Sequence, residues 1–255
     1  MSTAGCASSR APQTAYNYPI APPPPDRATM GIDAVIDISR GVQVSDFRLV
    51  KRSGIAGVIH KASEGSDYPD SACAARRPAA EAAGLLWGTY HYGTASQTGA
   101  QQAAFYLACS RPGPRTLLAL DLEANDNNPA NSMRLDQAEE FVRAVAQATG
   151  RLPVVYVHPI WANGDPLPRS GLTFGARITP ASILARCPLW VSDYHESPEV
   201  PFAWAERGWK LWQYAADESA SHPAYGSTSI VEGVSHYDRN LFRGDATELH
   251  RFWGT

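Results

Sequence analysis

From residue 32 onward, short apolar runs alternate with amphipathic stretches, and this alternation constrains the fold more than any other feature of the chain. The apolar runs have the length of buried strands, and the stretches between them have helical periodicity. Strands are expected at residues 34–39, 57–63, 86–92, 116–123 and 153–158, and helices at 45–54, 76–83, 98–108 and 135–149. Repeated strand–helix units of this kind predict a parallel sheet with right-handed crossovers.

The rhythm changes after residue 158. A Gly/Pro-rich insertion covers residues 163–177, and three further strands are expected at 188–194, 209–214 and 235–242, closed by a helix at 245–252. A chain of 255 residues, 44% of them hydrophobic, can bury one large core. We therefore predict one α/β domain over residues 32–255, an irregular TIM-like barrel of five βα units followed by three strands.

Residues 1–31 differ in kind from the rest of the chain. A proline run at residues 22–25 is extended and cannot join a core, so this segment is predicted to be a disordered tether. Small residues flank Cys6 as they do at the processing site of bacterial lipoproteins, which makes Cys6 a candidate lipid anchor. The protein would then be exported, either as a periplasmic or cell-envelope lipoprotein or in secreted form. The alternative is an ordinary tail with a chance cysteine.

Charge and composition exclude several classes of partner. The net charge is −3 and the pI about 6.2, so no basic footprint points to nucleic acid. No apolar stretch is long enough to span a bilayer. The cysteines have no metal-type spacing, and Cys73, Cys109 and Cys187 are expected to be free thiols. We expect a monomer without metal or cofactor.

The expected strand at 116–123 carries the strongest chemical signal. Its apolar run ends in Asp121 and Glu123, whose side chains point the same way because strand residues alternate faces. Two carboxylates about 6–7 Å apart raise the proton affinity of one of them, so an acid and an anion can coexist near neutral pH. The alternative is a solvated pair on a loop. The carboxyl end of a barrel strand favours a catalytic pair.

Other expected strands end in residues that suit a sugar site. Aromatic rings offer flat apolar faces to pyranoses, although core packing is the alternative for any single ring. The candidate rings are Tyr90, Tyr156, Trp190, Trp212 and Tyr214, and polar groups come from Asp37, Gln213 and Asp238. Three histidines also lie late in strands, at positions 60, 91 and 158, but without ligand spacing they are interpreted as structural.

Eight short motifs occur in a fixed order, at residues 37–39, 46–47, 57–65, 88–92, 118–123, 189–191, 211–214 and 238–242. Together they resemble family 25 glycoside hydrolases, the Chalaropsis-type lysozymes. The resemblance implies a single, flattened (β/α)5(β)3 barrel. It also implies muramidase activity, which is cleavage of the β-1,4 bond from N-acetylmuramic acid to N-acetylglucosamine in the glycan strands of peptidoglycan.

The resemblance also assigns roles by position. It implies that Glu123 is the general acid and that Asp121 orients the acetamido group of the substrate in a retaining, substrate-assisted reaction. Asp121 as the nucleophile is the alternative, and Asp37 completes the catalytic carboxylates. The residues implied for substrate binding are Tyr90, Tyr156, Trp190, Tyr194, Gln213 and Asp238. We expect Glu123 to lie in the most apolar surroundings and to keep its proton longest.

Two departures from the family pattern concern the expected cleft rim. Arg40 and the two residues after it stand where a glutamine often follows the first motif, and the insertion at 163–177 is unusual. Two other functions stay open. A carbohydrate-binding relative with little turnover is disfavoured by the Asp121/Glu123 pair. A chitinase-like acetamido-sugar hydrolase could use a similar pair of carboxylates.

Overall fold

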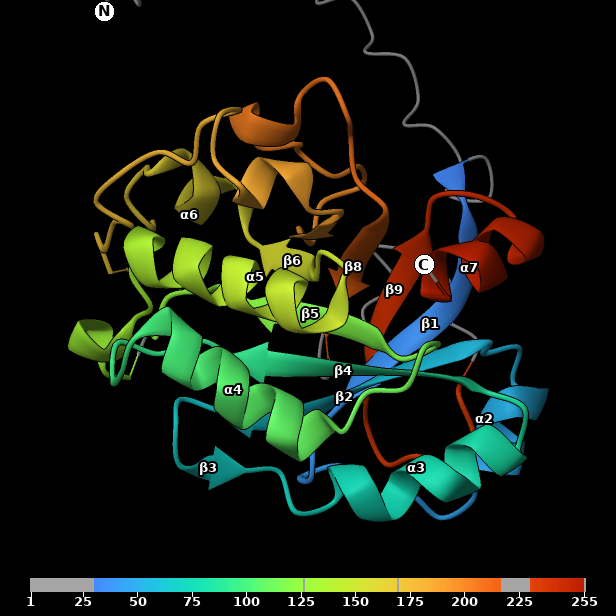
Figure 1. Cartoon of the computed structure of the whole chain (residues 1–255). Coiled ribbons are helices and arrows are strands. Elements are labelled where there is room, and N and C mark those ends of the chain that lie inside the picture. Colours follow the sequence, from blue (N-terminus) through green and yellow to red (C-terminus); the bar gives the residue numbers. More distant parts are fainter. Residues whose placement is uncertain (1–29, 126, 169, 217–229, 255) are drawn as a thin grey trace, which may run out of the picture.

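The computed structural model describes residues 30–125, 127–168, 170–216 and 230–254 (Figure 1). The predicted tether, apart from Met30 and Gly31, and the candidate anchor Cys6 lie outside these residues. The strands are β1 (Ile32–Ile38), β2 (Gly57–Glu64), β3 (Tyr68–Pro69), β4 (Leu86–Tyr92), β5 (Leu117–Asp121), β6 (Val154–Val157), β7 (Leu189–Ser192), β8 (Leu211–Ala215) and β9 (Asp238–Phe242). The α-helices are α2 (Phe47–Arg52), α3 (Cys73–Ala82), α4 (Gly99–Ser110), α5 (Leu135–Thr149), α6 (Pro159–Asn163) and α7 (Ala246–Trp253).

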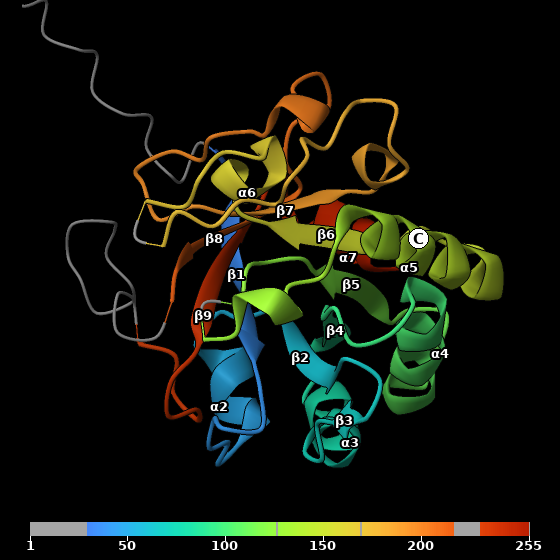
Figure 2. The same cartoon turned by 90° about the vertical axis from the view of Figure 1, so that its left-hand side faces the viewer.

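Eight of the strands close into a barrel. Their order is β1-β9-β8-β7-β6-β5-β4-β2, and pairing of β1 with β2 closes the ring, while β3 extends the end of β2. Figure 2 shows the strands around this ring, with α2 to α5 outside β1 to β5 and the short α6 with irregular loops beside β6 to β8. The prediction of five βα units followed by three strands is confirmed.

The last strand, β9, runs opposite to the other seven strands of the ring. It pairs antiparallel with both β1 and β8, whereas the other neighbours in the ring are parallel. The amino end of β9 therefore lies beside the carboxyl ends of the other strands. This reversal places Asp238, the first residue of β9, at the end of the barrel where active sites form.

Alternation along the strands separates two apolar layers. One face of each strand fills the barrel, as Val35, Ile59, Ala119 and Leu211 do. The opposite face packs against the outer helices and loops. At the amino ends of the strands Trp253 of α7 closes the barrel, where its indole N–H donates to the carbonyl of Trp87 (2.8 Å).

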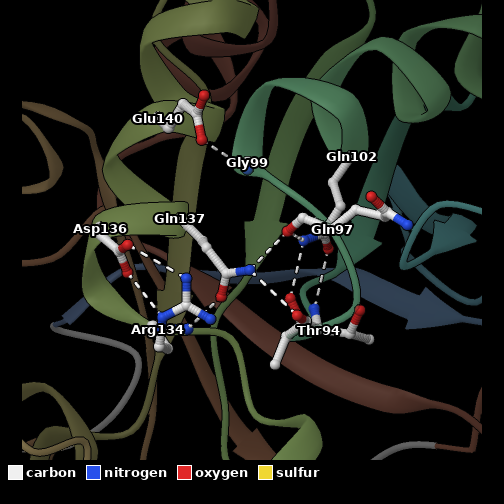
Figure 3. A network of polar contacts seen from close by, with 9 residues as sticks. Thr94, Gln97, Gly99, Gln102, Arg134, Asp136, Gln137 and Glu140 are labelled. Carbon is white, nitrogen blue, oxygen red and sulfur yellow. Dashed lines mark hydrogen bonds and ion pairs between the residues drawn. The ribbon is translucent and has the colours of Figure 1, made fainter.

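Figure 3 shows how the loop after β4 is tied to α4 and α5. The side chain of Gln102 accepts from the backbone N–H of Thr94 (3.0 Å) and donates to the carbonyl of the same residue (2.8 Å). Gln137 on α5 donates to the carbonyl of Gln97. The Gln102 carbonyl oxygen also lies 3.2 Å from the imidazole of His91 on β4. These contacts fix the carboxyl end of β4 on the helical layer.

The structure also bears on the cysteines and on membrane-spanning segments. Cys73, Cys109 and Cys187 are free thiols in the structure, as predicted. In the described part of the chain, no helix has the length and apolarity needed to cross a membrane.

An ion pair between a buried arginine of β9 and a partly exposed aspartate of β1 links these neighbouring strands. Arg239 is only 2% exposed, and its guanidinium donates to the carboxylate of Asp33 (2.6 Å). The hydroxyl of Tyr214 on β8 donates to the same carboxylate (2.6 Å). Three strands therefore meet at the Asp33 side chain.

Replacing Asp33 by Asn is expected to lower the free energy of unfolding by about 2–4 kcal/mol, because it leaves a buried guanidinium without its anion. Urea unfolding at neutral pH measures this change. Asp165 is exposed and takes part in no ion pair with a described residue. Asp165→Asn is the matched control and should stay within about 0.5 kcal/mol of wild type. A loss below about 1 kcal/mol for Asp33→Asn would contradict the assignment.

Candidate active site

A cavity of about 350 Å³ opens at the carboxyl ends of the parallel strands. Side chains from eight strands or the segments just after them surround it. The lining consists of Asp37, Lys61, Tyr90, Tyr92, Asp121, Glu123, Tyr156, Trp190, Tyr194, Gln213 and Asp238. The structure thus brings together all nine residues to which the family resemblance assigned a catalytic or substrate-binding role.

Strand alternation explains why these side chains meet. Asp37 follows the interior residue Val35 by two positions, and Asp121 follows Ala119 in the same way. Gln213 bears the same relation to Leu211 on β8. The polar lining is therefore the last layer of the interior face, placed directly above the apolar filling of the barrel.

The same alternation overturns two of the expected sugar-binding rings. Trp212 and Tyr214 flank Gln213 on β8, so they point away from the cavity into the outer layer. Trp212 is fully buried and its indole donates to the carbonyl of Asp193, while Tyr214 donates to Asp33. These two rings are core residues, and their prediction as sugar contacts was wrong.

Two lining residues, Lys61 and Tyr92, were not among the residues predicted from the sequence. Lys61 follows Ile59 on the interior face of β2, and Tyr92 follows Tyr90 on β4, so the period of two could have found both. The ammonium group of Lys61 donates to Glu64 (2.7 Å) and lies 4.9 Å from the centre of the Tyr92 ring. Lys61 is thus a cation in an otherwise acidic cavity.

Asp121 is the more enclosed carboxylate of the central pair. It is 8% exposed, and its buried Oδ1 atom has no hydrogen-bond partner among the described residues. Burial, and then the neighbouring charge of Glu123, raise the pKa of Asp121 well above its usual value. Because β5 ends at Asp121, Glu123 lies beyond the strand and is only half-buried. Our expectation that Glu123 has the most apolar surroundings was therefore wrong.

A chain of hydrogen bonds holds Asp37 at the cavity wall. Its carboxylate accepts from Nε2 of Gln213 (3.1 Å) and from Nδ2 of Asn240 (2.8 Å). The indole of Trp190 donates to Oδ1 of Asn240 (2.7 Å), which fixes the orientation of that amide. The hydroxyl of Tyr156 donates to Oε1 of Gln213 (2.8 Å), which fixes the orientation of the Gln213 amide. Asn240 was not among the predicted site residues, although it lies on the interior face of β9.

The tyrosines are neutral hydrogen-bonding groups. Burial raises the pKa of Tyr90 well above its usual value, and the nearby charges of Asp37, Asp121 and Asp238 act in the same direction. Burial likewise raises the pKa of Tyr156. At neutral pH both therefore keep their hydroxyl protons, so Tyr156 can donate to Gln213, and Tyr90 can donate to a sugar oxygen or a carboxylate. Tyr194 is 38% exposed and stands at the rim.

The histidines serve the scaffold. His91 lies between Ser63 (2.9 Å) and Gln102 (3.2 Å) in the outer layer, and burial lowers its pKa to about 3. His60 contacts the carbonyl of Lys61 (2.7 Å), and burial lowers its pKa to about 4. His158 caps α6 by accepting from the backbone N–H of the second helical residue. In the described ranges, no group of acidic, histidine or cysteine side chains could hold a metal ion.

The described residues of the long insertion lie away from the cavity. None of its described residues is in the lining, and Phe174 instead stacks on Trp161 of α6 with ring centres 5.2 Å apart. The expectation that the insertion shapes the cleft rim was therefore wrong. Arg40, the other departure from the family pattern, lies just outside the lining.

Comparison with known proteins identifies the family. The family model described as glycosyl hydrolases family 25 matches residues 36–222, which is more than half of the chain. The chain belongs to family 25. Membership makes it a glycoside hydrolase, and the cavity at the carboxyl ends of the strands is the part of this family 25 barrel with the carboxylates that such chemistry needs.

Individual relatives agree with this assignment. Lysozyme M1 of Streptomyces globisporus is 28% identical over 92% of this chain and 86% of its own length. The bacterial lysozyme of Streptomyces coelicolor superposes with a TM-score of 0.70 at 27% identity, covering 89% of this chain and 98% of the other. A family GH25 lysozyme from Aspergillus fumigatus gives 0.68 at 26% identity, covering 88% and 99%.

Within this family 25 site, the charge of Lys61 is expected to lower the pKa of Asp121. Its positive charge opposes the rise in the pKa of Asp121 that burial and Glu123 cause. Lys61→Met should therefore raise that pKa further, so Asp121 should ionise at a higher pH than in wild type. Carbon NMR of the Asp121 carboxyl group across a pH titration measures this directly. Lys61→Arg keeps the charge and should restore the wild-type midpoint, whereas an unmoved midpoint in Lys61→Met would contradict the assignment.

Proposed function

We propose that this protein cleaves the β-1,4 bond between N-acetylmuramic acid and N-acetylglucosamine in peptidoglycan, with retention of the anomeric configuration. One observation carries the proposal. In a family 25 barrel, the cavity holds the carboxylates Asp121 and Glu123, two positions apart at the end of β5, among neutral tyrosines. A glycosidase needs such a pair, in which one group donates a proton while a charge is stabilised nearby.

In the proposed reaction Glu123 protonates the leaving glycosidic oxygen. The acetamido oxygen of the same muramic acid residue attacks the anomeric carbon as the bond to the leaving sugar breaks, which gives an oxazolinium ion. The carboxylate of Asp121 accepts a hydrogen bond from the acetamido N–H and so stabilises the positive charge of this ring. Water, which gives a proton to Glu123, then attacks the anomeric carbon, and the ring opens to restore the acetamido group. The two inversions at the anomeric carbon amount to retention.

Features of the lining support binding of a sugar. Tyr156 and Trp190 form an edge-to-face pair with ring centres 4.9 Å apart at the floor of the cavity, and both are largely buried. Gln213 and Asp37 present hydrogen-bonding groups beside them. Tyr194 and Asp238 extend the lining at the open side. Buried rings with fixed polar groups suit one pyranose in a defined orientation.

The location and state of the protein follow from this proposal. Peptidoglycan lies outside the cytoplasm, so we propose that the protein is exported and acts there as a monomer on glycan strands. The lipid anchor proposed at Cys6 lies outside the described residues. Labelling of the full-length protein with a radioactive fatty acid tests the anchor, and Cys6→Ser should abolish the label.

Mass spectrometry of digested peptidoglycan tests the proposed bond. Purified sacculi are treated with the protein, the new reducing ends are reduced with borohydride, and the products are identified. We expect muramitol at the reducing ends. Glucosaminitol would assign the enzyme to the other glycosidic bond. Release of nothing from sacculi, with cleavage of chitin oligosaccharides, would favour the chitinase-like function, and no cleavage of either would favour a binding protein.

A further inference from the structure

A row of alternating rings and cations leaves the cavity on the side of β2 and β3. The ammonium group of Lys61 lies 4.9 Å from the centre of the Tyr92 ring and 5.9 Å from that of Tyr68. The guanidinium carbon of Arg40 lies 4.5 Å from the centre of the Tyr68 ring. Tyr92 and Lys61 line the cavity, whereas Tyr68 and Arg40 continue the row outside it. We call these four residues the cationic row.

The backbone fixes the outer half of the cationic row. Tyr68 belongs to β3, which pairs antiparallel with the carboxyl end of β2, so that Tyr68 lies opposite Glu64. Arg40 follows the end of β1 by two residues, and its backbone N–H donates to the carboxylate of Asp70 (2.8 Å). Arg40 and Tyr68 are therefore held side by side at the same end of the barrel as the cavity.

Arg40 is the cation of the row whose side chain has no acidic partner among the described residues. Lys61 already pairs with Glu64 at 2.7 Å, but the guanidinium of Arg40 forms no ion pair with any described residue. It is exposed, and it rests on a ring that is 36% exposed. A guanidinium stacked on a ring keeps its N–H groups free at the edge, in the fork geometry that matches a carboxylate.

The cavity next to the row has the opposite charge. Asp37, Asp121, Glu123 and Asp238 line it, and Lys61 is the one cation in the lining among the residues that the structure describes. An anionic substituent on a bound sugar is repelled by this wall and attracted toward Arg40. Repulsion by the acidic wall and attraction by Arg40 therefore favour one orientation of the sugar, with its anionic substituent facing β3.

We propose that Arg40, stacked on Tyr68, forms a subsite for a carboxylate carried by the glycan substrate. The inference rests on the proposed function, because each muramic acid carries a lactyl carboxylate that is either free or extended by a stem peptide with carboxylates of its own. Arg40 stands where family 25 chains often have glutamine, so the subsite gives this chain a preference for anionic strands.

Steady-state kinetics on soluble, uncross-linked glycan strands test the subsite. Arg40→Gln removes the charge and keeps a polar side chain. Arg115→Gln is the matched control, because Arg115 is also exposed but precedes β5 at the opposite end of the barrel. We expect Arg40→Gln to raise KM about 3–10-fold with kcat unchanged, and Arg115→Gln to match wild type. Neutralising the strand carboxylates by amidation should make the KM of Arg40→Gln and wild type equal.

Two further arms identify the carboxylate and separate this inference from the proposed function. On strands stripped of stem peptides, a persisting effect of Arg40→Gln assigns the lactyl group, and a vanished effect assigns the stem. Calorimetric titration of the same strands into wild type and both variants gives dissociation constants that do not depend on turnover. Absence of cleavage by wild type would overturn the proposed function alone. Equal KM and equal dissociation constants for Arg40→Gln and Arg115→Gln, or an effect that survives amidation, would overturn the subsite.

Discussion

Replacing Glu123 by Gln is expected to abolish turnover and to leave the fold and glycan binding almost unchanged. The amide keeps the shape of the side chain but cannot donate a proton, and general acid catalysis contributes about 10²–10⁴-fold. Glu123 is half-buried and lies beyond the end of β5, so the free energy of unfolding should change by less than about 1 kcal/mol. Release of reducing ends from peptidoglycan measures turnover, and calorimetric titration with glycan strands measures binding.

Glu206→Gln is the matched control for this substitution. Glu206 is exposed and lies outside the lining of the cavity, so the same chemical change there should leave kcat at the wild-type value. Retention of more than about a tenth of the wild-type rate by Glu123→Gln would remove Glu123 from the role of general acid. A large loss of binding without loss of kcat would instead assign Glu123 to substrate contact.

Replacing Asp121 by Asn is expected to act on activity and stability in opposite directions. Turnover should fall by about 10²–10³-fold, because the developing charge on the acetamido group loses its anion. The pKa of Asp121 in the folded protein lies well above the unfolded value of 3.8, because of burial and then Glu123. Ionisation of the buried carboxyl therefore destabilises the native state as pH rises, and Asn cannot ionise.

The stability difference between Asp121→Asn and wild type should change with pH in a defined direction. Below the unfolded pKa of about 4 both states are protonated and the ionisation cost is absent, whereas at neutral pH it is present. The free energy of unfolding of Asp121→Asn, relative to wild type, should therefore increase between pH 3 and pH 7. Denaturant titrations at both pH values measure it, with Asp165→Asn as an exposed control that should show no such trend. A difference that is flat or falls with pH would contradict a destabilising Asp121.

Strand alternation made much of the site predictable. The apolar run before Asp121 identified an interior strand, and the same reasoning placed Asp37 at the cavity. Where alternation was not applied, prediction failed. Trp212 and Gln213 are neighbours on one strand, so they cannot both face the interior, yet both were taken as candidates. Gln213 lines the cavity, whereas Trp212 packs in the apolar layer on the outer face of β8, which loops cover.

Other features depend on contacts between distant segments. The reversed direction of β9 puts Asp238 and Asn240 at the site, and no pattern within residues 238–242 reveals that direction. The relative burial of Asp121 and Glu123 depends on β5 ending between them. Tyr68 meets Arg40 only because the two-residue strand β3 pairs with β2, and a strand this short has no periodicity to read.

The stereochemistry of the first product tests the central claim, that Asp121 and Glu123 cleave the glycosidic bond with retention, most directly. Proton NMR follows the anomeric signals while wild-type protein digests soluble glycan strands, before mutarotation equilibrates the new reducing ends. We expect the β-anomer of the muramic acid residue to appear first and the α-anomer later. An α-anomer that appears first would mean a single inversion by water and would contradict the account.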